Sequence, residues 1–333
     1  MKIRIAINGF GRIGRAFTRL ISSNKKYEIV AINDLAGSNV LSHLLKYDSI
    51  HGIFPESISH DKHNIIINDL YIPVYQIKNN SLYPWDKLNV DVVIESSGKN
   101  LTYDKAISHI HSGAKKVILS APPKTNDIKM IVMGVNNHIL DGSELIISNA
   151  SCTTNCAAPM IKILDDYCGI EKSYVTTVHS YTSDQNLHDS PHNDLRRARS
   201  ASTSIIPTTT GAAKALSLIF PKLNIGGCGI RVPVSNGSLT DITCVTKRSV
   251  SSSEINKNFM LSSNNVFKNI LSYTADPIVS VDIISNKYSC IFDSQLTYSF
   301  GNFVKIVGWY DNEYGYSSRL IDLINEIFNK KNN

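Results

Sequence analysis

The sequence predicts an α/β protein of two domains: a doubly wound parallel sheet, then an α+β domain with a mostly antiparallel sheet. Three observations predict this fold class. A strand, a glycine-rich turn and an amphipathic helix open the chain, and apolar strands alternate with helical segments up to about residue 150. Longer strand patterns follow, rich in Val, Ile and Thr with polar residues between them. A length of 333 residues also favours two cores over one.

The opening unit carries the signature of a nucleotide-binding turn. The strand pattern IRIAIN is followed at once by GFGRIG. In such a turn Gly9 permits the tight bend, Gly11 lets the backbone approach a pyrophosphate, and Gly14 allows close packing of helix on strand. The next strand runs directly into Asp34, where a carboxylate can accept from ribose hydroxyls and repel a 2′-phosphate. The unit predicts a Rossmann domain that binds NAD rather than NADP; the alternative is a glycine-rich turn with a stray aspartate.

The remaining elements are predicted from the spacing of apolar residues. In the first domain we expect helices near 40–45 and 105–112, and strands at 65–67, 72–75, 90–96, 117–119, 130–135 and 145–148. In the second we expect strands at 174–179, 229–234, 241–247, 278–284 and 304–310, with helices at 157–166, 211–220, 252–261 and 313–330. The glycine-rich run at 226–229 predicts a locally flexible loop.

Composition narrows the class of protein. The net charge of +6 is modest and not gathered into a stripe, so no dedicated nucleic-acid site is expected. The six cysteines lack metal-ligand spacing, which predicts free thiols in a reducing compartment and no metal site. No apolar run is long enough to span a membrane, and a strand pattern begins at residue 3, so we expect no signal peptide and a cytoplasmic location.

The segment SNASCTTNC at 148–156 is the strongest chemical signal. It places Cys152 between a short apolar strand and an expected helix. A helix N-terminus carries partial positive charge, which lowers the pKa of a thiol and favours the nucleophilic thiolate. Several hydroxyl side chains lie in the same turn, and free backbone N–H groups there can bind an anion. We expect covalent thiol chemistry beside an anionic substrate; the alternative is a buried structural cysteine.

The second domain supplies partners for this thiol. His179 ends a strand, where an imidazole can pair with the thiolate and act as general base. Arg199, the helix start at Thr210 and Gly211, and Arg231 are groups expected to bind phosphates. A structural histidine and an interior ion pair of Arg231 are the alternatives.

At this point the chain resembles the phosphorylating glyceraldehyde-3-phosphate dehydrogenases almost end to end. The motifs that carry the resemblance are INGFGRIGR at 7–15, SNASCTTNC at 148–156, HSYTSDQ at 179–185, DLRRAR at 194–199, SIIPTTTGAAKA at 204–215, RVPV at 231–234 and WYDNEYGYS at 309–317. The resemblance implies a Rossmann domain at 1–150, a catalytic domain at 151–315, and a C-terminal helix at 316–333 that packs back on the first domain. It also implies a homotetramer.

The resemblance also implies the reaction and its residues. Cys152 would attack the aldehyde of glyceraldehyde 3-phosphate and His179 would take the thiol proton as hydride passes to NAD; inorganic phosphate would then release the thioester as an acyl phosphate. The implied substrate-phosphate site is Thr182, Asp184 and Arg231, and the implied inorganic-phosphate site is Ser151, Thr153, Arg199, Thr210 and Gly211. The implied NAD contacts are Asn8, Gly9, Gly11, Arg12, Ile13, Gly14, Asp34, Lys78, Ser97, Ser120, Asn312 and Tyr316.

Some positions depart from the family pattern. The surroundings of Lys78 do not follow it, Ser97 stands where threonine is usual, and Ser190 before Pro191 leaves use of NADP open. Two other functions are weighed: an erythrose-4-phosphate dehydrogenase, disfavoured by Tyr181-Thr182 and by TTTGAAKA at 208–215, and a nucleotide-dependent binding or regulatory protein, disfavoured by the intact thiol and histidine. A non-phosphorylating aldehyde dehydrogenase is disfavoured because its deacylation needs a carboxylate base.

Overall fold

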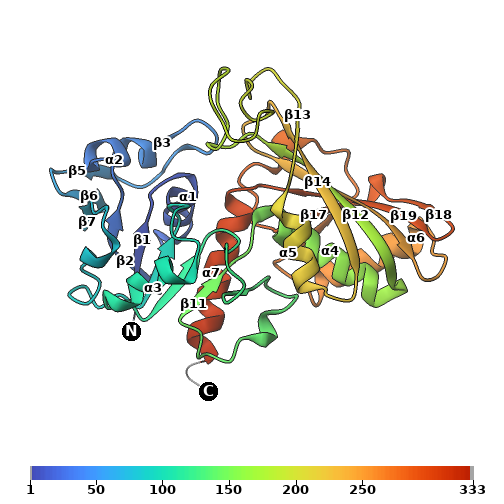
Figure 1. Cartoon of the computed structure of the whole chain (residues 1–333), viewed down its shortest axis with the longest axis horizontal. Coiled ribbons are helices and arrows are strands. Elements are labelled where there is room, and N and C mark those ends of the chain that lie inside the picture. Colours follow the sequence, from blue (N-terminus) through green and yellow to red (C-terminus); the bar gives the residue numbers. More distant parts are fainter. Residues whose placement is uncertain (1, 331–333) are drawn as a thin grey trace. The chain divides into compact units, whose positions relative to one another are not determined.

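The computed structural model describes residues 2–330. The chain forms two compact units (Figure 1). The first comprises the residues up to Ile131, Asn137–Ala150 and the residues from Ser317 onward, and the second comprises Val132–Asn136 and Ser151–Tyr316. The C-terminal helix α7 (Tyr314–Lys330) therefore begins in the second unit and belongs to the first from Ser317.

The first unit alternates strands and helices. Its elements are β1 (Ile3–Asn8), α1 (Arg12–Ile21), β2 (Tyr27–Asn33), α2 (Ser38–Lys46), β3 (Tyr47–Asp48), β4 (Gly52–Ile53), β5 (Ile58–His60), β6 (Asn64–Ile67), β7 (Leu70–Tyr75), η1 (Asn80–Leu82), β8 (Val92–Glu95), α3 (Tyr103–His111), β9 (Lys116–Leu119), β10 (Lys129–Met130), η2 (Asn137–Ile139) and β11 (Ile146–Ser148).

The main sheet of this unit has nine strands in the order β10-β11-β9-β8-β1-β2-β7-β6-β5. The strands from β10 to β7 are parallel, and β6 and β5 continue the sheet antiparallel. Asn8, the last residue of β1, pairs in register with Asn33 of β2 and Glu95 of β8. Because all three strands end there, their polar side chains meet at one edge of the sheet, where ligands bind in such folds.

The second unit contains the longer strands. Its elements are α4 (Cys152–Cys168), β12 (Ile170–Ser180), β13 (Ile206–Thr208), α5 (Gly211–Ile219), β14 (Asn224–Val232), β15 (Ser238–Thr246), α6 (Ser252–Asn264), β16 (Leu271–Thr274), η3 (Ser280–Ile283), β17 (Cys290–Asp293), η4 (Ser294–Leu296), β18 (Tyr298–Phe300) and β19 (Phe303–Tyr310).

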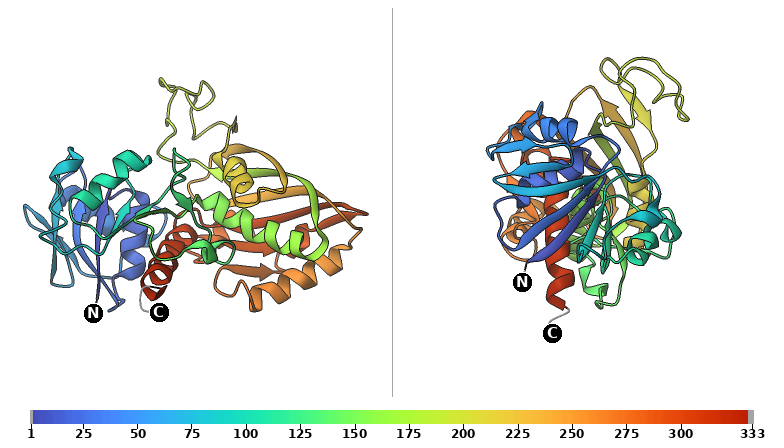
Figure 2. Two further views of the ribbon diagram at one scale, coloured as in Figure 1. Left: turned by 60° about the horizontal axis from the view of Figure 1, so that its bottom comes forward. Right: turned by 90° about the vertical axis from the view of Figure 1, so that its left-hand side faces the viewer.

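The sheet of the second unit runs β13-β14-β12-β15-β19-β17-β16, with β18 paired to β19. It is mostly antiparallel, but β16 runs parallel to β17 and β12 runs parallel to β14. The pairing of β12 with β14 puts His179 directly opposite Arg231. Helix α4 packs against β12, β15, β17 and β19, with α5 and α6 beside it (Figure 2). The first residue of α4 is Cys152, so the sheet and this helix together fix where the thiol lies.

Several sequence expectations were wrong in detail. Within the segment 278–284, expected to be a strand, Ser280–Ile283 form the 3₁₀ turn η3. The strand expected at 130–135 is reduced to the two-residue β10 (Lys129–Met130). The glycine run 226–229 is not a loop but the middle of β14. A Cβ on Gly227 would lie 2.5 Å from the carbonyl oxygen of Val175 and 3.2 Å from the Cβ of Ala213 on α5. This glycine therefore serves close packing of strand and helix, not flexibility.

Within residues 2–330, no helix is long and apolar enough to cross a membrane. No group of three or more His, Cys, Asp and Glu side chains in that range could hold a metal ion. All six cysteines are free thiols.

Candidate active site

Cys152 is the first residue of α4, and the preceding residue caps the helix. The Ser151 side chain accepts a hydrogen bond from the backbone N–H of Thr154 at 3.1 Å, and the two hydroxyls lie 2.7 Å apart. A serine in this place satisfies one of the unpaired N–H groups of a helix start. Ala150 just before it has a φ of 55°, an uncommon backbone conformation for a residue with a side chain. The chain thus bends sharply to present the thiol at the helix start.

His179 reaches this thiol from the end of β12. Its Nε2 lies 3.4 Å from Sγ of Cys152. The other ring nitrogen, Nδ1, lies 2.7 Å from the carbonyl oxygen of Ser180 and 2.7 Å from Nη1 of Arg231. Arg231 also donates to the Ser180 carbonyl at 3.0 Å. The parallel register of β12 and β14 brings the histidine and the arginine together, so thiol, imidazole and guanidinium form one contiguous group.

Burial dominates the electrostatics of this group. It raises the pKa of the Cys152 thiol, while the charge of Arg231 and the backbone N–H of Thr153 act in the opposite direction without outweighing it. Burial, and next the charge of Arg231, lower the pKa of His179. The helix start alone therefore does not give the low thiol pKa that the sequence predicted. Proton transfer from Sγ to Nε2 would create an ion pair whose attraction at this short range opposes both costs of burial.

Two further side chains are fixed beside this group. The buried hydroxyl of Tyr310 bridges the hydroxyls of Thr153 (2.9 Å) and Thr177 (2.8 Å), and its ring meets the His179 ring edge-on. Asn312 accepts at Oδ1 from the hydroxyls of Ser180 (2.9 Å) and Ser238 (3.1 Å). The amide nitrogen of Asn312 is thereby left as the side-chain group able to donate.

The start of α5 and a neighbouring arginine are candidate phosphate ligands. Thr210 caps α5 by accepting from Ala212 N–H at 3.2 Å, and Gly211 is the first residue of that helix. Arg197 donates to the hydroxyl of Thr208 and the carbonyl of Thr209, pairs with Asp184, and its charge acts on both His179 and Arg231.

The predicted Arg199 is exposed and pairs with Asp189 instead. Arg197, which the sequence analysis did not single out, is therefore the arginine that contacts the segment before α5 and whose charge acts on His179 and Arg231. The paired arginines in the motif offered no signal to choose between them.

The first unit holds the other set of predicted residues around the glycine turn. Gly9 has a φ of +92°, and a Cβ there would lie 2.5 Å from the backbone nitrogen of Ser97. A Cβ on Gly14 would lie 2.6 Å from the carbonyl oxygen of Gly9. By contrast, a Cβ on Gly11 would meet nothing within 4 Å. Gly11 is the N-cap of α1, so no side-chain hydrogen bond caps the start of this helix. The helix start therefore faces open space.

Residues of each of the two units match a known protein domain. Residues 3–103 match the model of the NAD binding domain of glyceraldehyde 3-phosphate dehydrogenase, and residues 151–312 match that of its C-terminal domain. The chain belongs to the glyceraldehyde 3-phosphate dehydrogenase family. Among curated relatives, the glyceraldehyde-3-phosphate dehydrogenase of Streptomyces coelicolor is 50% identical over 329 residues, and that of Mycobacterium avium 47% over 333. Each alignment covers 97% of this chain and 98% of the relative.

The residues of the first unit fit the NAD of this dehydrogenase family. The uncapped start of α1 suits a pyrophosphate. Asp34 follows β2 and accepts from the backbone N–H groups of Phe10 and Ala36, which fixes its carboxylate beside the turn. Ser120 follows β9, and its N–H donates to the Glu95 carbonyl at 2.9 Å.

Other predicted NAD contacts lie on α1, after β7 and on α7. The guanidinium of Arg12 is paired with Asp48. Lys78 is exposed on the segment after β7, and Tyr316 is buried on α7. Ile13 follows Arg12 in the first turn of α1.

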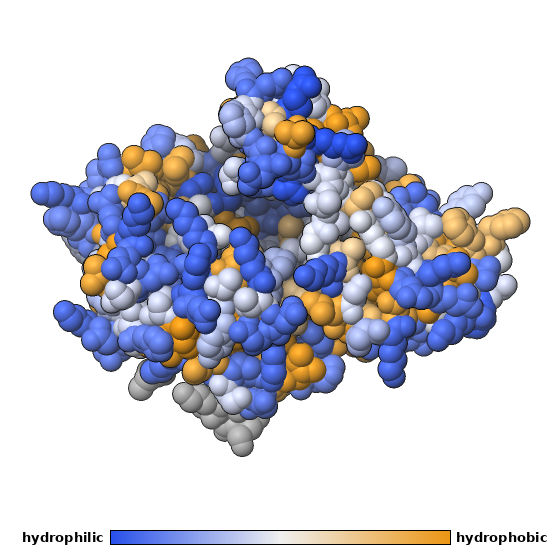
Figure 3. Space-filling view, viewed as in Figure 1, coloured by the Kyte–Doolittle hydropathy of each residue, from blue (hydrophilic) through white to orange (hydrophobic). Residues whose placement is uncertain are grey.

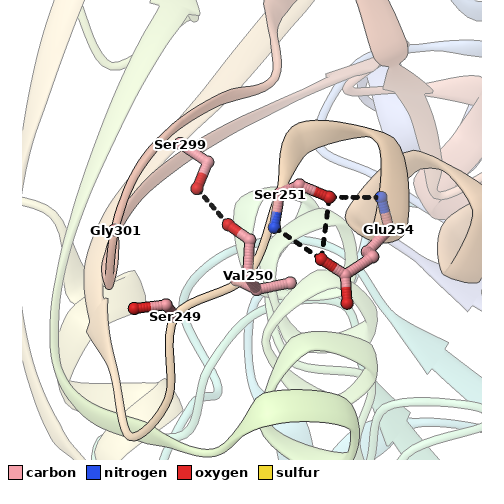
Figure 4. Close-up of a pocket in the computed structure, with 6 residues that line it drawn as sticks. All are labelled: Ser249, Val250, Ser251, Glu254, Ser299 and Gly301. Atoms are coloured by element: carbon pink, nitrogen blue, oxygen red, sulfur yellow. Dashed lines mark hydrogen bonds between the residues drawn. The ribbon is translucent and has the colours of Figure 1, made fainter.

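A surface depression of about 370 Å³ lies elsewhere in the second unit (Figure 4). Its lining residues are Ser249, Val250, Ser251, Glu254, Ser299 and Gly301. Ser251 and Glu254 form a reciprocal cap at the start of α6, and the Ser299 hydroxyl donates to the Val250 carbonyl (Figure 4). These polar groups satisfy one another, and none belongs to the predicted site of the dehydrogenase family.

Proposed function

We propose that this chain catalyses the NAD-dependent oxidative phosphorylation of D-glyceraldehyde 3-phosphate to 1,3-bisphosphoglycerate. The observation that carries this is the contact of Cys152 at 3.4 Å with His179, whose other ring nitrogen contacts Arg231. A nucleophile, a base and an anion-binding cation are the three groups that covalent oxidation of a phosphorylated aldehyde needs.

Cys152 and His179 perform the covalent steps. As Sγ of Cys152 attacks the aldehyde carbon, the thiol proton passes to Nε2 of His179 and a hemithioacetal forms. When bound, NAD supplies the oxidant for the two-electron conversion of this adduct to a thioester. In the first step His179 passes the thiol proton on to the aldehyde oxygen, so the hemithioacetal carries a hydroxyl group. His179 then takes this hydroxyl proton as the adduct is oxidised. Attack of inorganic phosphate on the thioester carbon then expels the Cys152 thiolate and gives the acyl phosphate.

Arg231 has two tasks in this scheme. Its guanidinium is half-buried and contacts both His179 Nδ1 and the Ser180 carbonyl, so its charge opposes protonation of the imidazole. A phosphate that binds Arg231 neutralises this charge, which makes His179 a better base when substrate is present. We assign Arg231, Thr182 and Asp184 to the substrate phosphate.

We assign the attacking phosphate to Ser151, Thr153, Thr210 and Gly211, with Arg197 in place of Arg199. The hydroxyl of Thr153 is held by Tyr310, and Thr210 and Gly211 form the start of α5. Arg197 is favoured because it contacts the segment just before that helix start, whereas Arg199 pairs with Asp189. The Asn312 amide, with its oxygen occupied by two serines, is assigned to the nicotinamide carboxamide.

The test follows NADH formation from glyceraldehyde 3-phosphate with and without inorganic phosphate. We expect turnover that needs phosphate, prefers NAD to NADP, and falls when erythrose 4-phosphate replaces the three-carbon substrate. Phosphate-independent turnover would contradict the acyl-phosphate product. Preference for the four-carbon sugar would identify an erythrose-4-phosphate dehydrogenase. NAD binding without any turnover would identify a binding or regulatory protein.

We further propose a homotetramer in the cytoplasm. The segment 181–205 carries three strongly exposed aliphatic side chains, Leu187 (66% exposed), Leu195 (81%) and Ile205 (69%). The space-filling view shows hydrophobic groups among the hydrophilic surface of this segment, at the top (Figure 3). Apolar groups on a loop of this length suit contact with another subunit. Free thiols suit a reducing compartment. Light scattering measures the subunit number; a monomeric mass would contradict the tetramer.

A further inference from the structure

A second cluster of buried polar side chains lies in the first unit, centred on the carboxylate of Glu95 at the end of β8. This side chain is fully buried. Its Oε2 accepts from Nδ2 of Asn8 (2.6 Å) and of Asn100 (2.9 Å), and lies 3.0 Å from Nε2 of His109. Its Oε1 accepts from the backbone N–H (2.9 Å) and the hydroxyl (2.5 Å) of Ser97. Five hydrogen bonds converge on one carboxylate.

The partners keep this carboxylate ionised. Trp85 Nε1–H donates to Nδ1 of His109 at 3.0 Å, so the neutral ring carries its hydrogen on Nε2 and donates it to Glu95. Every one of these groups can then donate to the carboxylate, which favours its ionised form. Burial acts to raise the pKa of Glu95, but the hydrogen bonds from His109, Ser97 and Asn8 outweigh it, and the pKa lies below its usual value.

The hydrogen bonds continue from this anion along the sheet edge. Oδ1 of Asn8 accepts from Nδ2 of Asn33 at 2.7 Å, and Oδ1 of Asn33 accepts from the N–H of Ile77 at 2.8 Å. Asn33 directly precedes Asp34, and Ile77 directly precedes Lys78. One directed chain of hydrogen bonds therefore links the anion to the backbone next to two of the predicted NAD contacts.

Ser97 is the predicted NAD contact that touches the anion itself. Its hydroxyl hydrogen is donated to Glu95, and its oxygen accepts from the N–H of Lys99 at 3.2 Å. Its backbone lies so close to Gly9 that a Cβ there would clash with it. The Ser97 oxygen is thus fixed in place and can only accept a hydrogen bond from a ligand.

We infer that Glu95 is a positioning residue for NAD. It holds Ser97 as an acceptor for a neutral hydrogen-bond donor of the cofactor and anchors the amide chain behind the neighbouring contacts. The inference rests on the proposed function, because it presumes that NAD binds at this sheet edge. It makes Glu95 matter for cofactor affinity rather than for the covalent steps at the thiol.

The test compares Glu95→Gln with Glu28→Gln by calorimetric titration of the full chain with NAD. Glutamine would turn an –NH2 group toward groups that all donate. We expect the Kd for NAD to rise at least about tenfold, and the KM for NAD to rise in parallel while kcat changes less than about threefold. Glu28 lies on the same sheet in β2, half-exposed and paired with Arg4, and its variant should bind NAD as the wild type does.

A double-mutant cycle separates positioning from general damage to the fold. If Glu95 acts through Ser97, Glu95→Gln combined with Ser97→Ala will cost less affinity than the two single losses together. A folded Glu95→Gln that binds NAD like the wild type overturns the inference and leaves the proposed function intact. If the wild type itself fails to bind NAD, the proposed function falls.

Should Glu95→Gln not fold, variants of Ser97 decide with Glu95 unchanged. Ser97→Ala should lose at least about tenfold in NAD affinity, and Ser97→Thr, which keeps the hydroxyl, should stay within about threefold. Equal affinity of Ser97→Ala and the wild type would overturn the inference.

Discussion

Nη1 of Arg231 lies 2.7 Å from Nδ1 of His179, while Nε2 of the same ring faces the sulfur of Cys152 at 3.4 Å. The imidazole is therefore held between a cation and a nucleophile. The pairing of β12 with β14 builds this arrangement, since the histidine and the arginine are register partners. The geometry lets an event at the arginine, such as phosphate binding, change the proton affinity of the ring that serves the thiol.

Cys152→Ser tests the covalent step. A serine hydroxyl is close to the thiol in size but far less acidic and less nucleophilic, so it attacks the aldehyde much more slowly beside the same histidine. We expect NADH formation to fall at least about a thousandfold with NAD affinity unchanged. Turnover at the wild-type rate would mean that another group attacks the aldehyde. Cys156→Ser, one turn further along α4 and fully buried, is the matched control.

His179→Asn tests the base. Asparagine can still donate to the Ser180 carbonyl but cannot take a proton from the thiol. Loss of a general base slows the chemical step by about a hundredfold or more, whereas the KM for glyceraldehyde 3-phosphate should change little. Stopped-flow measurement of the first turnover separates the two quantities. Losses of equal size in kcat and in binding would indicate a structural histidine.

The roles of Arg197 and Arg199 can be separated by variants. Arg197 contacts the Thr208–Thr209 segment and acts electrostatically on His179, whereas Arg199 is exposed and paired with Asp189. We expect Arg197→Ala to raise the KM for inorganic phosphate about tenfold and Arg199→Ala to change it less than about twofold. A larger rise in this KM for Arg199→Ala than for Arg197→Ala would favour Arg199, the assignment that the sequence suggested. Initial rates over a range of phosphate concentrations provide the measurement.

The first unit could be predicted from sequence more closely than the second. The bounds of β1 were predicted correctly, and β2 ends directly before Asp34 as expected, because buried parallel strands are continuous apolar runs bounded by turn residues. Strands β16 and β17 were missed, because LSYT and CIFD are short and lack alternation. The thiol and the histidine carried local signals, but the selection of Arg197 depends on contacts across the 184–209 segment that no local pattern encodes.

Gly227→Ala tests the corrected place of the glycine run in β14. The added methyl would come within 2.5 Å of the Val175 carbonyl on the neighbouring strand, so the strands must shift apart. We expect a loss of about 1–3 kcal/mol in the free energy of unfolding. Gly226→Ala is the milder comparison, because its Cβ would meet only the ring of Tyr174 at 3.1 Å, half-exposed and able to move. Equal stability of Gly227→Ala and the wild type would favour a flexible segment.

Asp48→Asn tests the ion pair behind the glycine turn. Burial acts to raise the pKa of Asp48, but the backbone N–H groups of His51 and Ile50 and the guanidinium of Arg12 outweigh it and hold the pKa at about 2, below the ordinary 3.8. A depressed carboxyl pKa stabilises the folded chain above the unfolded-state pKa, and this contribution disappears as the pH falls through the folded-state value. The shift corresponds to about 2 kcal/mol at neutral pH.

We therefore expect the free energy of unfolding of Asp48→Asn to be lower than that of the wild type by a constant amount above about pH 5. This difference in free energy should narrow as the pH falls from about 4 towards 2. Urea unfolding between pH 7 and pH 3 measures both stabilities. Asp276→Asn is the control, because Asp276 is exposed and its carboxylate makes no hydrogen bond or ion pair within residues 2–330. This variant should show neither the loss nor its pH dependence. A gap that widens on acidification would mean that Asp48 is not held as an anion in the folded chain.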